Sequence, residues 1–388
     1  MPQLTGELRY HAFIPKPLPP NPRLKMDMEI QALLSDADRA LGRLDGVTET
    51  LPDPNLFVAM YVRKEAVLSS QIEGTQASLI NLLEYELEQA SKGASADIGE
   101  VVNYVSAMNY GLHRLKDLPV SLRLIKEIHE KLLTGVRGAD RNPGEFRSSQ
   151  NWVGPPGCTI LQATFVPPPP ADMKAALGDL EKFLYDNRPM PLLVKIGLTH
   201  AQFETIHPFL DGNGRIGRLL ITLLLCQRGI LHHPLLYLSY YFKQNRAEYY
   251  DRLIAIRTKG DWEGWLKFFL QGVHAVAHQA TDTARKINAL RVQHSQMVRA
   301  RVSGALTGLR LLDLLYLSPV LTVKNARETL NISYVSANNL FRDFEDLGIL
   351  MQMTTGRRNR VFAYGPYLNL FLDEESPKVY IPLHNDRD

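Results

Sequence analysis

The chain has 388 residues, of which 45% are hydrophobic and 22% charged, as in an ordinary globular protein. This composition excludes a disordered, collagen-like or coiled-coil chain, and the length is enough to bury a sizeable core. Lysine and arginine number 44 and aspartate and glutamate 41, giving a formal net charge of +3. Such a balance does not by itself indicate nucleic acid or an acidic membrane as a partner.

Several features predict a soluble, cytoplasmic protein with no membrane partner. The N-terminus has no basic patch followed by an apolar run, so we expect no signal peptide. The longest strongly apolar stretch, residues 219–226, is far shorter than the roughly 20 residues that a membrane helix needs. The two cysteines, Cys158 and Cys226, suit a reducing compartment and neither a disulfide framework nor a metal cluster.

The first quarter of the chain predicts an extended arm followed by helices. Residues 1–25 contain six prolines and no sustained period. Apolar spacing predicts helices over residues 26–44, 56–90 and 98–115. Pro52 to Asn55 form a helix-start signal in which Asn55 caps the second of these helices.

The middle of the chain is predicted to be helical with one exception. Further helices are expected near residues 122–133, 173–185, 192–203, 215–228, 246–258 and 261–297. Residues 143–170 differ, because four consecutive prolines at 167–170 prevent a helix there. The short runs 159–161 and 164–166 favour β structure, so we expect a loop or hairpin laid on a helical body. The four prolines are either a stiff connector or an SH3-type ligand.

Residues 305–365 are predicted to form a separate unit. Apolar periodicity indicates helices over 306–317, 322–330 and 334–347, with Thr322 capping the second. Strands over 349–353 and 360–364 follow, on either side of a Gly-Arg-Arg turn. Three helices followed by a two-stranded wing are typical of a winged helix-turn-helix domain.

Residues 207–218 are the most informative stretch for function. Gly212 and Gly214 allow positive φ and a close approach of the backbone to a ligand. They stand at the start of a helix, where free N–H groups and the dipole favour an anion. Arg215 and Arg218 lie on one side of the first turn and suit bidentate contacts with phosphates.

Two further residues of this stretch add chemistry to a phosphate site. Asp211 is an oxygen ligand suited to Mg²⁺, which binds one or two carboxylates together with substrate phosphates. His207 is the one good general base in the loop, and Pro208 biases it toward an extended backbone. Phe209 can anchor the loop in the core. Together these residues predict a nucleoside triphosphate site with a base beside it.

Each feature alone has a simpler interpretation. Gly-Asn-Gly is commonly a turn, a histidine before proline is commonly structural, and Asp211 can cap the following helix. Their combination within twelve residues favours the phosphate site, which is not a P-loop because no Gly-Lys-Ser/Thr is present. A zinc site formed by His200, His207 and Asp211 is an alternative that leaves the glycines and arginines unexplained.

The stretch resembles the signature of the Fic family, His-x-Phe-x-Asp/Glu-Gly-Asn-Gly-Arg-x-x-Arg, at every fixed position, and the likeness extends over roughly residues 55–270. The resemblance implies a Fic-type helical core. It also implies an enzyme that transfers AMP from ATP to a serine, threonine or tyrosine hydroxyl of a target protein or of itself, releasing pyrophosphate. Other Fic members transfer UMP, phosphate or phosphocholine, and the intact Gly-Asn-Gly-Arg favours AMP.

The resemblance assigns roles within the loop. His207 deprotonates the target hydroxyl, and Asp211 holds Mg²⁺ that bridges the α- and β-phosphates of ATP. Arg218 pairs with the γ-phosphate. The anion hole is implied to comprise the amide side chain of Asn213 and the N–H groups of Gly212, Gly214 and Arg215.

Residues 69–74 resemble the inhibitory-helix motif of Fic proteins through Ser69, Glu73 and Gly74. The likeness implies that Glu73 forms a salt bridge with Arg218, so that two anions compete for one guanidinium and ATP binds unproductively. A solvated glutamate on a helix is the simpler interpretation. Glu73 orienting a water for removal of AMP is a weaker hypothesis.

Two other segments resemble parts of the family. Residues 143–170 resemble the flap, a hairpin that docks the target by strand pairing over His207, with Thr164 and Phe165 as edge residues. A structural loop is the alternative. Residues 245–250 resemble a helix start where an aromatic ring lies against the nucleoside, and Tyr249 is preferred over Tyr250 for that place.

The predicted organisation has five parts. They are an arm and first helix (1–54), a catalytic core with the inhibitory helix and flap (55–285), a connecting helix (286–304), a winged-helix domain (305–370) and a tail (371–388).

The predicted fold class is mainly α, and the rival function is a DNA-binding regulator whose Fic-like core senses a nucleotide. Helix 334–347 carries Arg342 among three acidic residues, a poor phosphate face, and the local basic residues are Arg357, Arg358 and Arg360. Whether this unit binds DNA or protein, and whether a homodimer influences the segment around Glu73, stay open.

Overall fold

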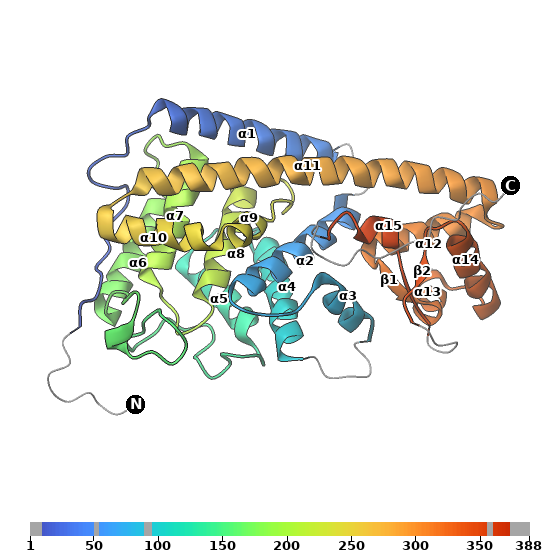
Figure 1. Cartoon of the computed structure of the whole chain (residues 1–388), viewed down its shortest axis with the longest axis horizontal. Coiled ribbons are helices and arrows are strands. Elements are labelled where there is room, and N and C mark those ends of the chain that lie inside the picture. Colours follow the sequence, from blue (N-terminus) through green and yellow to red (C-terminus); the bar gives the residue numbers. More distant parts are fainter. Residues whose placement is uncertain (1–9, 50–53, 89–94, 355–359, 373–388) are drawn as a thin grey trace.

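The computed structural model describes residues 10–49, 54–88, 95–354 and 360–372, and these are mainly helical. In this part of the chain the longest helix is α11 (Trp262–Arg301), which runs along one side of the molecule (Figure 1). Helix α1 (Met28–Glu49) packs along the N-terminal part of α11. None of the described helices is long and apolar enough to cross a membrane.

The functional region is built from the helices between α1 and α11. They are α2 (Pro54–Ile72), α3 (Leu79–Glu88), α4 (Ala96–Arg114), α5 (Leu122–Leu133), α6 (Pro170–Leu184), α7 (Leu192–Ile206), α8 (Asn213–Gln227), α9 (Ser239–Gln244) and α10 (Arg246–Lys259). In α7 every residue except Leu192 and Lys195 is buried, and α8 is buried from Arg215 to Leu225. Helices that are buried on all sides form the centre of a domain. The loop between them is therefore held by the core at both ends.

Sequence signals account for where several helices begin. The hydroxyl of Ser121 accepts a hydrogen bond from the N–H of Leu124 and caps α5, whose bounds match the prediction. The carboxylate of Asp261 caps α11 in the same way through the N–H of Gly264. Helix α6 starts at Pro170, since proline fits the first turn although it cannot continue a helix.

The C-terminal unit contains α12 (Ala305–Leu317), β1 (Val320–Thr322), α13 (Val323–Leu330), α14 (Tyr334–Asp346), β2 (Met351–Gln352), β3 (Val361–Ala363) and α15 (Gly365–Leu368). The strands form an antiparallel sheet in the order β1-β3-β2, with Leu321 opposite Phe362. Thr322 caps α13 as predicted. The unit packs on α2, where the rings of Phe57 and Tyr316 lie 5.5 Å apart (Figure 1).

The structure differs from the prediction for this unit in one strand, and two further predictions for it and for the helix before it stay untested. Strand β1 was not predicted, because it has three residues, the last of which is the Thr322 cap, and gives no period of its own. The predicted turn with Arg357 and Arg358 lies outside the described residues, as do residues 373–388 of the predicted tail. Helix α11 continues to Arg301 without a break at the expected boundary of 285/286, and that boundary stays a prediction.

The single helix predicted over 56–90 is wrong. Helix α2 begins at Pro54, one residue before the expected cap, and ends at Ile72. Glu73 and Gly74 form a turn, and α3 starts at Leu79. Gly74 has φ +99°, a left-handed conformation that stops a helix and that glycine adopts at little cost.

The predicted hairpin at 143–170 is reduced to one pair of residues. Val153 and Phe165 form an antiparallel bridge with hydrogen bonds in both directions (2.8 and 3.0 Å). The run expected to favour β structure at 159–161 instead enters a 3-10 turn, η1 (Ile160–Gln162). Thr159 and Gln162 hold this turn by a reciprocal cap, which outweighs the β preference of the intervening residues.

Candidate functional site

The loop between α7 and α8 is shaped by left-handed residues at both ends. His207 ends α7 with φ 49° and ψ 61°, and Gly212 precedes α8 with φ 78°. The extended backbone predicted for His207 is wrong. Its N–H completes the last helical hydrogen bond with Phe203 (2.9 Å), and the guanidinium Nε of Arg147 holds its carbonyl (3.0 Å). The positive φ expected at Gly212 is confirmed, whereas Gly214 is helical.

Asn213 braces the loop from inside. Its Oδ1 accepts from the N–H of Phe209 (2.8 Å), and its Nδ2 donates to the carbonyl of the same residue (2.9 Å). Both polar ends of this buried amide are therefore used by the main chain. In this structure the side chain of Asn213 closes the turn that leads into the N-terminus of α8, and its place in an anion hole stays a prediction.

His129 on α5 supports the same loop and was not predicted. Its Nδ1 accepts the N–H of Gly144 (2.9 Å), so the proton lies on Nε2 and is donated to the carbonyl of Asp211 (3.0 Å). The imidazole also stacks on Phe209, with ring centroids 3.7 Å apart. Burial lowers the pKa of His129 to about 4, which keeps the ring neutral in this arrangement.

Arg147 and Asn151 hold the loop from the side of the proline-rich segment. The Nη2 of Arg147 donates to Pro168 (2.5 Å), while its main-chain N–H donates to Pro208 (2.9 Å). Asn151 Nδ2 donates to the carbonyl of Phe209 (2.9 Å). A fully buried arginine that reaches several carbonyls is unexpected from sequence, since Arg147 precedes two serines in a polar segment.

Arg215 is committed to an internal ion-pair network. Its guanidinium lies 3.2 Å from Glu100 Oε2 and 3.2 Å from Asp211 Oδ1, and the side chains of Arg215 and Glu100 are both 1% exposed. Glu100 also contacts Arg137 (3.1 Å). The guanidinium of Arg215 is therefore held by carboxylates in this structure, and its contact with phosphates stays a prediction. The sequence offered no signal for Glu100, which lies on α4 far from the motif.

Arg218 is held by the end of α2. Its Nε donates to Ser69 Oγ (2.9 Å), and its Nη2 donates to the carbonyl of Ser69 (2.9 Å) and to Glu73 Oε1 (2.7 Å). The ion pair predicted between Glu73 and Arg218 is thus present. It requires a glycine at 214, because a Cβ there would overlap Glu73 Oε1 and lie 2.9 Å from Arg218.

The charges around the loop set the protonation of Glu73 and His207. Burial raises the pKa of Glu73, but the guanidinium groups of Arg218 and Arg215 outweigh it, so the pKa lies below its usual range. Burial, followed by Arg257 and Arg147, lowers the pKa of His207 to about 4. The imidazole is consequently neutral at pH 7 and able to accept a proton.

Glu204, one helical turn before His207, is a second residue that the sequence did not reveal. Its Oε1 is buried and has no hydrogen-bond partner among the described residues. The carboxyl packs against Gly217, where a Cβ would overlap it, and burial raises its pKa to about 7. Glu204 is therefore a buried carboxyl with a raised pKa, close to the charge of Arg218.

The prediction that Tyr249 contacts a nucleoside is wrong. Tyr249 is 1% exposed, and its hydroxyl bonds His200 Nε2 (2.9 Å) inside a cluster of aromatic rings. His200 also bonds the carbonyl of Gly217 (2.9 Å), so both of its nitrogens are occupied and the alternative zinc site fails. Tyr250, the second choice, is half-buried, and Glu73 and Arg218 both act on its pKa, which burial raises to about 12.

Asp211 fits one side of a Mg²⁺ site. Its Oδ1 accepts hydrogen bonds from the N–H of Gly212 (2.5 Å) and from Arg215. Its Oδ2 lies against Gly138, where an added Cβ would be 2.9 Å from it. The side chain is 33% exposed. The described residues contain no group of three His, Cys, Asp or Glu that could hold a metal. A single carboxylate suits Mg²⁺ only when substrate phosphates complete the coordination.

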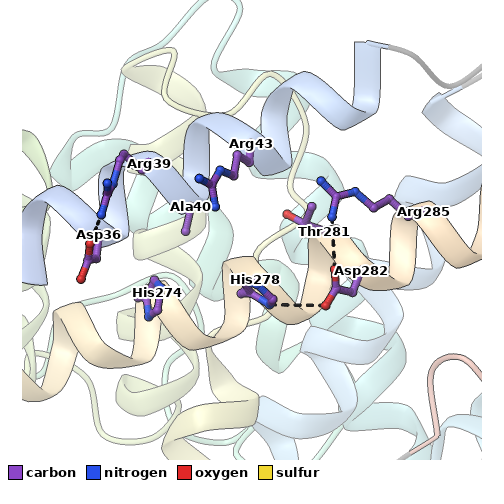
Figure 2. Close-up of a pocket in the computed structure, with 9 residues that line it drawn as sticks. All are labelled: Asp36, Arg39, Ala40, Arg43, His274, His278, Thr281, Asp282 and Arg285. Carbon is purple, nitrogen blue, oxygen red and sulfur yellow. Dashed lines mark hydrogen bonds and ion pairs between the residues drawn. The ribbon is translucent and has the colours of Figure 1, made fainter.

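A separate hollow of about 180 Å³ lies between α1 and α11 and contains none of the loop residues (Figure 2). Several of its charged side chains pair with one another: Arg39 pairs with Asp36, and Asp282 lies 3.4 Å from His278 and 3.5 Å from Arg285. The loop at the N-terminus of α8 is therefore the better candidate site.

The described residues form a mainly helical protein in which a short loop joins His207, at the end of α7, to the N-terminus of α8. Residues 31–113 match the family model described as Fic/DOC family N-terminal, and residues 119–225 match the Fic/DOC family model. Over these two stretches the chain is similar to the Fic/DOC family.

Relatives of known name support the same family. A probable protein adenylyltransferase of Aquifex aeolicus is 28% identical over 176 residues, which are 45% of this chain and 51% of the relative. The protein adenylyltransferase Fic of Aedes aegypti is 32% identical over 203 residues, 51% of this chain and 37% of the relative. The chain thus spans about half or less of the length of these relatives.

The fold is also similar to that of a solved structure. The crystal structure of a Fic family protein from Desulfovibrio desulfuricans G20 aligns with a TM-score of 0.58 at 20% identity. The alignment covers 88% of this chain and 97% of that protein.

Proposed function

We propose that this protein is an adenylyltransferase that moves AMP from ATP to a serine, threonine or tyrosine hydroxyl of a target protein or of itself. The observation that carries the proposal is the neutral imidazole of His207 beside the N-terminus of α8 and the buried guanidinium of Arg218. The names of the relatives from Aquifex and Aedes agree with it. The match covers less than two thirds of those proteins, so the activity is inferred for this chain.

The proposed step is an in-line displacement at the α-phosphorus of ATP. The target hydroxyl oxygen bonds to phosphorus, the bond to the bridging oxygen of the β-phosphate breaks, and pyrophosphate leaves with that electron pair. His207 accepts the hydroxyl proton. Main-chain N–H groups of Gly214 and Arg215 face the charge that develops at the start of α8. Asp211 would hold Mg²⁺, which neutralises phosphate charge when bound.

We further propose that the chain restrains itself through Glu73. Arg218 is the cation that the γ-phosphate needs, and its Nη2 is occupied by Glu73 (2.7 Å) and by the carbonyl of Ser69 (2.9 Å). A carboxylate and a phosphate compete for the same guanidinium. ATP that enters with Glu73 in place then lacks its γ-phosphate contact and lies in an unproductive position.

The C-terminal unit is proposed to be a winged-helix module that binds a partner macromolecule. Its order of helices and its antiparallel sheet support this interpretation. The contact between Tyr316 and Phe57 places it against α2, the helix that carries Ser69. We propose that a partner bound to this unit, or a second copy of the chain, acts on the Glu73–Arg218 contact through α2.

Label transfer from ATP tests the proposed activity. We expect the Glu73→Gly chain, incubated with Mg²⁺ and ATP labelled at the α-phosphate, to modify itself at sites that mass spectrometry can map. Adding His207→Ala should reduce the rate roughly 10²- to 10⁴-fold, the usual contribution of a general base. ATP binding, measured by calorimetry, should survive that change. Undiminished label transfer without the imidazole would refute the proposal.

A further inference from the structure

The N-terminal arm, residues 10–25, is anchored to α7 and α11, and its first residues lie against the proline-rich segment. The carbonyl of Lys16 accepts from Gln202 Nε2 on α7 (2.8 Å), and the N–H of Lys25 donates to Glu263 on α11 (2.7 Å). Five prolines between residues 15 and 22 restrict the backbone of this stretch, which bends at residues 18–19 and 21–22. The arm therefore delivers residues 10–14 to a defined place.

That place is the outer edge of the Val153–Phe165 bridge. Phe165 uses both of its main-chain groups to pair with Val153. Because main-chain groups alternate along an extended segment, those of Thr164 and Val166 face the opposite side. The N–H of Phe13 donates to the carbonyl of Val166 on that side (2.9 Å). The arm thus begins a second strand pairing at the edge that we expected to dock a target.

Aromatic contacts connect this edge to the catalytic loop. The rings of Phe13 and Phe165 lie 6.3 Å apart, and the guanidinium of Arg257 lies 3.8 Å from the centre of the Phe165 ring. Arg257 in turn donates to Thr205 Oγ1 (3.4 Å) and to the carbonyl of Glu204 (3.3 Å), in the last turn before His207. A segment on this edge therefore lies beside the turn that carries the base.

The arm is held at this edge by few interactions. A hollow of about 350 Å³ lies beneath it, lined by Phe13 and Ile14 on one side and by Gln202, Thr205 and Arg257 on the other. Pro15 lacks an N–H, which ends any pairing after Ile14. One main-chain hydrogen bond contributes little net stability. A longer extended segment without proline would form more such bonds and can displace the arm.

We propose that residues 10–14 occupy, in cis, the edge that an extended segment of the target protein takes during modification. The incoming segment supplies an aromatic or large apolar side chain in the place of Phe13, over Phe165 and Arg257. This inference rests on the proposed function, since it identifies the class of segment that reaches His207. Release of the arm is then a step that precedes target docking, separate from release of Glu73.

The test uses the full-length chain and a fluorescent synthetic peptide of residues 10–15, with binding followed by anisotropy in the absence of ATP. Phe13→Pro removes both the N–H donor and the ring, whereas Phe13→Ala keeps the donor. We expect the peptide to bind the Phe13→Pro chain about 10-fold more tightly than wild type, since an arm on its own tether competes at high effective concentration. Phe13→Ala should give an intermediate affinity, and a peptide with alanine for Phe13 should bind more weakly.

Two results would overturn the inference. One is equal peptide affinity for wild type and Phe13→Pro chains that share the same melting temperature. The other is unchanged binding when Phe165→Ala is added to Phe13→Pro, because the peptide would then occupy some other surface. The readout needs no catalysis. Absent label transfer with the expected peptide binding would count against the adenylyltransferase alone, and the reverse pattern against the arm alone.

Discussion

Arg215 and Arg218 lie three residues apart at the start of α8, yet their guanidinium groups have different partners. Arg215 faces Glu100 on α4, and both side chains are fully enclosed. Arg218 faces the end of α2, where its partner Glu73 is 32% exposed. Both guanidinium groups are buried and ion-paired, but the carboxylate of Glu100 is enclosed whereas that of Glu73 is partly exposed.

This difference separates positioning from regulation. The Arg215 side joins Glu100 and Asp211 to a loop that His129 and Asn213 also brace, so its ion pair is a fixed part of the fold. On the Arg218 side, Glu73 and Gly74 form a turn directly after α2, at the edge of the core. An inhibitory contact must be reversible, and a half-exposed carboxylate after a helix end satisfies that condition better than an enclosed one.

Removing one charge from each pair should give the largest contrast. Glu100→Gln keeps the side-chain shape but leaves Arg215 with Asp211 alone, and we expect a loss of about 3 kcal/mol in the free energy of unfolding, as for other broken buried pairs. The matched change Glu73→Gln should cost about 1 kcal/mol or less, because the side chain is partly exposed and its amide oxygen can still accept from Arg218. Urea unfolding followed by circular dichroism measures both. Equal losses would show that the two sides are equally structural.

For the rate of label transfer, a change at Glu73 should have the larger effect and a change at Glu100 the smaller one. Glu73→Gly frees Arg218 from a charge-assisted hydrogen bond worth roughly 1.5–3 kcal/mol, so we expect label transfer to rise about 10- to 100-fold. Glu100→Gln should not raise it, since Glu100 pairs with Arg215 and leaves the contact between Glu73 and Arg218 in place. Rates of self-modification at saturating ATP measure the change. Unaltered or reduced activity in Glu73→Gly, with ATP binding intact, would contradict the inhibitory role of this residue.

The partner of Arg218 was predictable from the local sequence, whereas the partner of Arg215 on α4 was not. Residues 207–218 and 69–74 are contiguous motifs, so the pairing of Glu73 with Arg218 was predictable from their likeness to family motifs. Glu100, His129 and Arg147 act on the loop from distant segments, and no period or spacing near them shows it. Most helices follow from apolar periodicity, whereas Tyr249 was misplaced because a core tyrosine and a ligand-binding one have the same local pattern.

Ser69→Ala provides the finest test of the regulatory side. The hydroxyl of Ser69 accepts from Arg218 Nε (2.9 Å), but the carbonyl of the same residue and Glu73 both remain after the change. Losing one buried hydrogen bond of about 1 kcal/mol should loosen Arg218 and raise label transfer roughly 5-fold, less than Glu73→Gly does. In the Glu73→Gly background the same change should add nothing, since Arg218 is already released there. A further increase in the double variant would show that Ser69 acts on the nucleotide by a route independent of Glu73.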